Sequence, residues 1–280
     1  LVEGMRRASA GSDGSDAAAV LERAIAADPS REEAYEALAE LWSARADLGP
    51  AMDACTRGIA ADAGYAPFWM LRADLRNRAA DTLADRGGDP EPEFAAALAD
   101  CGRALAIAPG HAEAWRVRGS IHLNRSDNSE GRGVDVEACL AAALADFGRA
   151  LELESDDPDS LVQRGMVQLE VASRHDRSGR GDPAEFVIAV ADFEAALTYS
   201  PGDARILTMR GMARLNQAKE TGSAPDEVPR LLQAALRDFD DAIRTDPRWD
   251  GGWLGRAMTR MNSALARIER GVDPREDFRN

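Results

Sequence analysis

Arginine and aspartate recur along this chain at one fixed interval of 46 residues, and we call residues that share a position in this period a column. The arginine column is Arg72, Arg118, Arg164, Arg210 and Arg256, and the aspartate column is Asp100, Asp146, Asp192 and Asp238. A planar guanidinium binds a carboxylate through two parallel hydrogen bonds. A carboxylate that recurs in several units therefore suits a structural ion pair better than acid–base catalysis.

The two columns are filled or empty together. A shorter unit near the start has Leu38 and Ala54 in these positions, whereas the four complete longer units have both charged residues. Pairing with the preceding unit would leave Arg72 opposite Ala54, while pairing within a unit leaves no charge alone. We therefore predict an ion pair within each unit, because a partly buried charge needs a partner. The alternative is two independently solvated columns, since surface pairs are common and weak.

The sequence contains no constellation for catalysis or metal binding. His111, His122 and His175 lie in different units without ligand spacing, and Cys139 has no activating partner in the sequence. No Ser/His/Asp order, nucleophile elbow or metalloprotease motif is present. Lys219 is the only lysine and follows no glycine-rich phosphate loop. We therefore predict that the protein is not an enzyme and needs no cofactor or metal.

Composition excludes several further classes of protein. The chain has 280 residues, of which 34 are basic and 49 acidic, with a formal net charge of −15. This balance argues against binding to nucleic acid or to an anionic membrane. No stretch approaches the eighteen consecutive apolar residues of a membrane span. Three cysteines give no disulfide framework, so the cytoplasm is the expected compartment.

The 46-residue interval also carries small and aromatic residues. The alanine column is Ala97, Ala143, Ala189 and Ala235, and the aromatic column includes Phe147, Phe193 and Phe239. Within a unit, residues 114–123 and 143–151 have apolar residues three or four positions apart, which predicts two helices. A shift of 34 residues extends the alanine column back to Ala51 and Ala17, so the first unit is twelve residues shorter. No segment alternates with a period of two, and we predict an all-α protein.

These columns resemble the tetratricopeptide repeat (TPR) family, in which a large residue is followed four positions on by a small one, and then by alanine, an aromatic residue, alanine and proline. The large column here is Tyr35, Trp69, Trp115, Leu161, Leu207 and Trp253, and the later columns include Ala143, Phe147, Ala150 and Pro201. The resemblance covers residues 1–280 and implies a single right-handed superhelical solenoid of about six helix pairs. Its first helices would line a concave face. The chain departs from the family in its longer period, in the arginine column, and in Cys55 and Cys101 at aromatic positions.

The twelve additional residues lie between the two helices of each longer unit. They occupy residues 80–91, 125–136, 173–184 and 221–228, with the last insert near 270–274. These segments are rich in glycine, aspartate, serine and proline, and several end in Asp-Pro, which starts a helix. We expect part of each insert to lengthen the helices and the remaining loops to form a row along one edge.

The resemblance places methionine, leucine and asparagine side chains on the concave face of the C-terminal half. These residues are Met166, Met209, Met212, Met258, Leu169, Leu215, Met261, Asn216 and Asn262. The equivalent positions of the N-terminal half are polar and include Glu40, Ser43, Asp74, Asn77 and Arg78. A methionine-rich surface adapts to varied apolar partners, so we predict that this groove binds a basic or amphipathic peptide or partner helix. The alternative is that these side chains pack on neighbouring helices.

We predict a protein-interaction scaffold or regulatory module. One alternative is a module that forms homo-oligomers by stacking its solenoid ends, and another is a sensory domain fused to a bacterial enzyme such as a protein kinase. The two ends predict a fragment of a longer solenoid. Residues 1–9 would supply the partner of the helix that holds Leu21, and Phe278 would lie at the start of an incomplete second helix. Arg256 would then lack the aspartate of its column.

Overall fold

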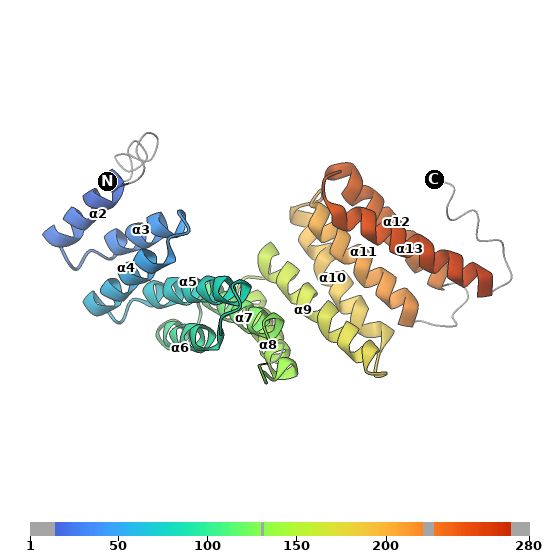
Figure 1. Ribbon diagram of the computed structural model, residues 1–280, viewed down its shortest axis with the longest axis horizontal. Coiled ribbons are helices and arrows are strands. Elements are labelled where there is room, and N and C mark those ends of the chain that lie inside the picture. Colours follow the sequence, from blue (N-terminus) through green and yellow to red (C-terminus); the bar gives the residue numbers. More distant parts are fainter. Residues whose placement is uncertain (1–14, 130–131, 221–226, 270–280) are drawn as a thin grey trace. The chain divides into compact units, whose positions relative to one another are not determined.

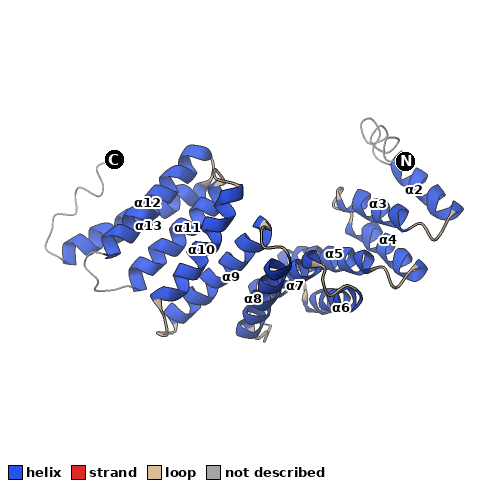
Figure 2. Ribbon diagram, turned by 180° about the vertical axis from the view of Figure 1, so that it is seen from behind, coloured by secondary structure: helices blue, strands red, loops and turns tan. Residues whose placement is uncertain are grey.

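The computed structural model describes residues 15–129, 132–220 and 227–269, and these residues form twelve α-helices and no strand (Figures 1 and 2). The helices are α2 (Ser15–Ala27), α3 (Glu32–Ser43), α4 (Leu48–Ala61), α5 (Ala66–Asp85), α6 (Glu91–Ile107), α7 (Ala112–Asp127), α8 (Val136–Leu153), α9 (Pro158–Arg177), α10 (Pro183–Tyr199), α11 (Ala204–Glu220), α12 (Glu227–Thr245) and α13 (Asp250–Glu269). The all-α prediction is confirmed. The helix expected over residues 1–9 and the helix start expected at Phe278 lie outside the described residues.

The helices form two compact units, one ending at Leu153 and the other beginning at Glu154. The first unit holds α2 to α8, and the second holds α9 to α13. Within each unit, α3, α5, α7, α9 and α11 each pack most extensively on the helix that follows, and each pair also packs on the next one. The order of contacts is therefore that of a stack of helix pairs. That the two units form one domain over residues 1–280 stays a prediction.

A contact between a ring and a glycine brings the two helices of three pairs together. Each phenylalanine of the aromatic column is fully buried, and its ring lies against a glycine on the preceding helix. The contacts are Gly119 with Phe147, Gly165 with Phe193 and Gly211 with Phe239. A Cβ atom added at these glycines would lie only 2.8–3.0 Å from the ring. Because carbon atoms pack at about 3.5–4.0 Å, any larger residue would push the helices apart.

The two pairs with cysteine in the aromatic column carry alanine in place of glycine. Ala39 and Cys55 belong to one buried cluster, and Ala73 and Cys101 belong to another, all with no exposed surface. The smaller side chain on the second helix thus leaves room for a Cβ on the first. Burial raises the pKa of the Cys55 and Cys101 thiols to about 12, so both are uncharged packing groups.

The inserts lengthen the helices on both sides and leave shorter loops between them. The second helices α6, α8, α10 and α12 have 17–19 residues, compared with 14 in α4. Helices α5 and α9 have 20 residues each, compared with 12 in α3. A glycine with a left-handed backbone follows the helix end in two inserts, Gly87 (φ 77°) after α5 and Gly179 (φ 72°) after α9. Gly133 (φ 68°) shares their column but lies in the loop before α8, because α7 already ends at Asp127. The left-handed conformation lets the backbone N–H groups close the last turn, as when Gly88 donates to the Leu83 carbonyl at 2.9 Å. The shorter unit uses Ala46 instead (φ 58°).

Candidate functional site

Four arginines of the column bind the aspartate of their own helix pair. The Nη2–Oδ1 distances are 2.7 Å for Arg72–Asp100, 2.6 Å for Arg118–Asp146, 2.7 Å for Arg164–Asp192 and 2.6 Å for Arg210–Asp238. Each Nε also donates to the same carboxylate, at 2.8–3.2 Å. The aspartate side chains are only 3–7% exposed. Pairing therefore occurs within each unit, and the two columns are not independently solvated.

Two of these aspartates bind a second arginine, one helical turn beyond the first. Arg76 Nη1 donates to Asp100 Oδ2 at 2.8 Å, and Arg214 Nη1 donates to Asp238 Oδ2 at 2.6 Å. This column of second arginines was not predicted from the sequence, because its residue type changes from unit to unit. The column could have been recognised from its constant position, four residues after each arginine that was expected to bind a carboxylate.

His122 and Gln168 occupy the same column in the other two pairs. His122 Nε2 lies 4.0 Å from Asp146 Oδ2, whereas His122 Nδ1 and Gln168 Oε1 are buried without a hydrogen-bond partner. Burial lowers the pKa of His122, and this effect outweighs the attraction of Asp146 for the charged form. The histidine thus fills space beside the ion pair as a neutral group at pH 7.

Tryptophans of the large column cover some of the arginines. The guanidinium lies over the ring at 5.1 Å for Arg72 on Trp69, 4.6 Å for Arg118 on Trp115 and 4.5 Å for Arg256 on Trp253. The hydrogen bond to its aspartate raises the pKa of Arg118, and the same holds for Arg72 and Arg164. The carboxylate therefore stabilises the charged form of each of these three arginines. These pairs join the two helices of a unit.

The methionine face is only partly open. Met166, Leu169, Met209, Met212 and Met258 are half-buried, as are Asn216 and Asn262, while Met261 is 52% exposed. The prediction that Leu215 lines the groove is wrong, because this side chain is fully buried in a cluster with Leu232 and Phe239 of α12. Met212 and Met258 pack against the edge of the same cluster.

The two asparagines of this face are held by hydrogen bonds. Asn262 Nδ2 donates to the Met258 carbonyl at 3.0 Å within α13. Asn216 accepts a hydrogen bond from Lys219 Nζ at 3.1 Å, and its own Nδ2 lies 3.5 Å from Ser173 Oγ on α9. Asn216 therefore joins two neighbouring first helices.

The equivalent positions of the first unit form a polar network between α3, α5 and α7. Arg78 Nη1 donates to Ser43 Oγ at 2.6 Å. Asn124 Nδ2 donates to Asp81 Oδ2 at 2.8 Å and to Asn77 Oδ1 at 3.3 Å. Burial is the main cause that raises the pKa of Asp81. The first helices of this unit are thus joined by several hydrogen bonds, whereas α9 and α11 of the second unit share the one between Asn216 and Ser173.

Helix α13 carries the largest group of exposed apolar side chains. Eleven large hydrophobic residues are exposed in the described part of the chain, and five of them lie on this helix. They are Trp253 (45%), Leu254 (64%), Met261 (52%), Leu265 (51%) and Ile268 (56%). Monomeric proteins seldom expose such a group without a partner. Of these residues only Met261 was predicted from the sequence, because the helical period alone does not tell which side of a helix its neighbours cover.

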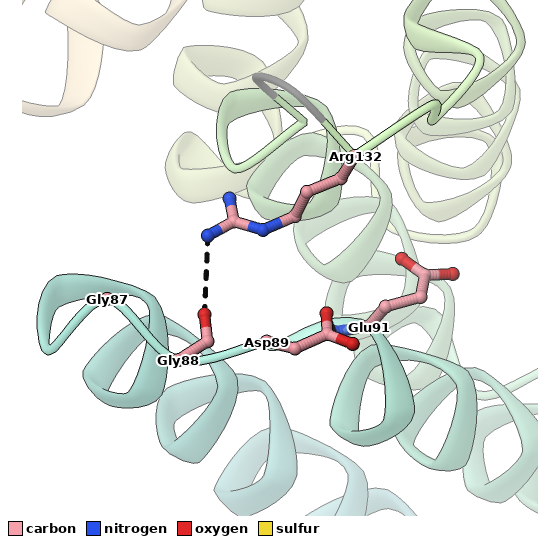
Figure 3. A pocket seen from close by; sticks show the side chains of 5 residues that line it. All are labelled: Gly87, Gly88, Asp89, Glu91 and Arg132. Atoms are coloured by element: carbon pink, nitrogen blue, oxygen red, sulfur yellow. Dashed lines mark hydrogen bonds between the residues drawn. The ribbon is translucent and has the colours of Figure 1, made fainter.

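A pocket of about 380 Å³ lies between two neighbouring insert loops (Figure 3). Its lining consists of Gly87, Gly88, Asp89, Glu91 and Arg132. Arg132 Nη2 donates to the Gly88 carbonyl at 3.3 Å, so these two loops lie side by side as the sequence predicts. Glu91 is already paired with Arg125, whose Nε lies 3.0 Å from Oε2. The insert over residues 221–228 falls largely outside the described residues, and the one near 270–274 falls entirely outside them.

The described residues contain neither a candidate metal site nor a helix that could span a membrane. No three histidine, cysteine or acidic side chains there are placed to hold a metal ion. No helix in this part of the chain is long and apolar enough to cross a membrane.

Comparison of the amino-acid sequence with protein-family models and with curated protein sequences gives no match. Solved structures do resemble the chain. One is YrrB, described as a TPR protein with an unusual peptide-binding site. The match includes 86% of this chain and 99% of the YrrB chain, at 16% sequence identity and a TM-score of 0.55. Another is PilW, a type IV pilus biogenesis factor. The match includes 90% of this chain and 94% of the PilW chain, at 17% sequence identity and a TM-score of 0.57.

A third is a thermophilic TPR protein of Thermus thermophilus. The match includes 81% of this chain and 98% of that protein's chain, at 16% sequence identity and a TM-score of 0.52. These likenesses agree with the features built above from the residues: stacked helix pairs and a small column that faces an aromatic column. The described part of the chain has the fold of the tetratricopeptide repeat family.

Proposed function

We propose that this protein is a protein-interaction scaffold without catalytic activity, and that α11 and α13 provide its binding face. The exposure of Leu254, Met261 and Leu265 on α13 is the observation that carries the proposal. Half-buried Met212 and Met258 extend this apolar surface towards α11. Flexible, polarisable methionines suit partners of varied shape.

The partner that fits this face is an amphipathic peptide or helix. Leu254, Met258, Met261 and Leu265 follow one another at intervals of four, three and four residues, which is the spacing that matches the apolar side of a second helix. The peptide-binding site in the description of YrrB supports a peptide partner in general.

A peptide library displayed on phage and selected against the whole chain tests this function. We expect the enriched peptides to be amphipathic helices whose binding falls at least tenfold with Leu254→Glu or Met261→Glu. Ile188→Glu on α10 is the matched control, because Ile188 is 54% exposed and lies on another helix. Circular dichroism should show unchanged helix content in all three variants.

Undiminished binding by both α13 variants would contradict the proposed face. Sedimentation velocity separates this function from end-to-end assembly. A monomeric wild-type chain agrees with the scaffold, whereas an oligomer that Leu254→Glu dissociates would favour self-assembly.

A further inference from the structure

One position of the second helices supplies an oxygen atom to an arginine of the next helix pair. This position lies two residues after the aspartate column, and we call it the acceptor column. Three of its side chains accept a hydrogen bond from a guanidinium of the helix that follows. The contacts are Thr56 with Arg72 at 3.1 Å, Glu194 with Arg214 at 2.7 Å and Asp240 with Arg256 at 3.3 Å.

In α6 the acceptor column holds a glycine, Gly102. It lies inside the helix and is exposed, and a Cβ atom added there would meet nothing within 4 Å. Neither a close contact nor a left-handed backbone therefore requires glycine, although glycine is unfavourable in a helix interior. The guanidinium that α6 leaves without an acceptor is that of Arg118 on α7. Arg118 lies close to α6, since its charge lowers the pKa of Cys101 against the larger, opposite effect of burial.

Arg118 is fixed in place, but one end of its guanidinium is open. Nε and Nη2 donate to Asp146 at 2.8 and 2.6 Å, and the guanidinium lies over the ring of Trp115 at 4.6 Å. Nη1 has no hydrogen-bond partner among the described residues. The Arg118 side chain is 28% exposed, compared with 12% for Arg72, which Thr56 contacts. A preorganised donor group thus remains accessible to solvent.

Arg214 shows that a guanidinium between two pairs can bind two carboxylates at once. Its Nη1 donates to Asp238 of its own pair at 2.6 Å, and its Nη2 donates to Glu194 of the preceding helix at 2.7 Å. The arginine lies between the two acids and attracts both of them. A second carboxylate next to a buried aspartate is therefore an arrangement that this protein already contains.

We propose that Arg118 and Gly102 form a recognition site for an acidic side chain of a partner protein. The carboxylate would accept a hydrogen bond from Nη1 of Arg118, in the role that Glu194 and Asp240 have in other pairs. Gly102 would let the partner chain approach α6 closely. Charge and geometry favour a carboxylate over a neutral group, because a guanidinium presents parallel N–H donors. The site lies in the first unit and is separate from the apolar face proposed on α11 and α13.

The probe is a phage-displayed library of helical peptides with one glutamate each, selected on the whole chain and counter-selected on its Gly102→Glu variant. This variant supplies the carboxylate from the chain itself. We expect peptides whose affinity falls roughly tenfold or more with Gly102→Glu, since a hydrogen bond to a charged group contributes about that much. Glutamine in place of the peptide's glutamate should have the same effect, and the two changes together should do little more. Gly102→Ala adds a methyl group without a carboxylate, and it should weaken binding less than about threefold.

Thermal melts test the geometry without any peptide. Gly102→Glu and Gly102→Gln should both melt above the wild-type chain, because each replaces a glycine inside a helix. The glutamate variant should melt higher than the glutamine variant at low salt, and high salt should remove this difference, because salt screens an exposed ion pair. If the two variants melt alike at low salt, the carboxylate does not reach Arg118 and the proposal fails.

Three outcomes of the selection would overturn the proposal. They are no peptide that distinguishes the wild-type chain from Gly102→Glu, selected peptides that bind equally well with glutamine, and a wild-type dimer that Gly102→Glu dissociates. The last outcome would show that a second copy of the chain fills the site. Peptides that require Leu254 but bind the Gly102→Glu variant normally would leave the scaffold function intact while this proposal fails.

Discussion

At the scale of single residues, an ion pair and a steric match define each helix pair. The ion pair was predictable from the sequence because arginine and aspartate are present or missing together in a unit, and a buried charge needs a partner. The steric match was not predicted, although its residues are visible. Glycine faces phenylalanine and alanine faces cysteine, but a repeat pattern does not tell which columns are in contact, and only the structure shows that these residues touch.

Loss of one partner of a buried ion pair should cost more stability than loss of an exposed carboxylate. Asp146 is 4% exposed, so Asp146→Ala would leave Arg118 without its carboxylate and should lower the free energy of unfolding by about 3 kcal/mol. Asp240→Ala, which removes a 54% exposed side chain, should change it by less than about 1 kcal/mol. Urea unfolding followed by circular dichroism measures both. Equal effects would show that burial does not strengthen the pair.

The glycine–phenylalanine contact of one unit can be transferred to a unit that has alanine and cysteine instead. Cys101→Phe should force the new ring against the Cβ of Ala73 and destabilise the protein by about 1–3 kcal/mol. The double change Ala73→Gly with Cys101→Phe reproduces the arrangement of Gly119 and Phe147, and it should recover most of this loss. The coupling energy from a double-mutant cycle is the measurement. A cycle with additive effects would mean that the two side chains do not determine each other.

At the scale of helices, the sequence predicted pairs and inserts, but it did not predict where the inserts would become helix. The insert from residue 80 begins inside α5, which continues to Asp85, and its loop ends at residue 90. The signal for this boundary was the column that holds Gly87 and Gly179, each of which adopts the left-handed conformation just after the end of a helix. Leu215 was misassigned for a related reason, since helical period cannot show that α12 covers it.

The end of α3 is strained in a way that glycine would relieve. Ala46 has a φ of 58°, a conformation that costs residues with a Cβ about 1–2 kcal/mol. Ala46 is exposed, so Ala46→Gly removes no buried contact and should raise the free energy of unfolding by about 1 kcal/mol. Gly87→Ala, the reverse change at an equivalent helix end, should lower it by a similar amount. Thermal melts of the two variants should shift in opposite directions, and shifts of the same sign would contradict the argument.

At the scale of the whole molecule, the 46-residue period determines the fold class, because each period supplies one helix pair and one set of contacts to the next pair. The period did not predict which helices expose apolar side chains to solvent. The exposed apolar side chains concentrate on α13, while the first helices of the N-terminal unit bind one another through polar groups. Such differences arise from substitutions within columns, so a repeat pattern alone does not reveal them.

A stack of helix pairs should respond locally to damage, because each pair contacts only its neighbours. Phe239→Ala removes a fully buried ring from α12 and should cost about 3–5 kcal/mol. We expect hydrogen exchange, followed by mass spectrometry, to become faster in α11, α12 and α13, with α3 to α6 unchanged. Cys101→Phe is the matching change in the first unit, and it should accelerate exchange in α5 and α6 while leaving α11 to α13 as they are. If either substitution accelerated exchange evenly in all twelve described helices, the protein would unfold as one cooperative body, and the stability of its units would not be the sum of local contacts.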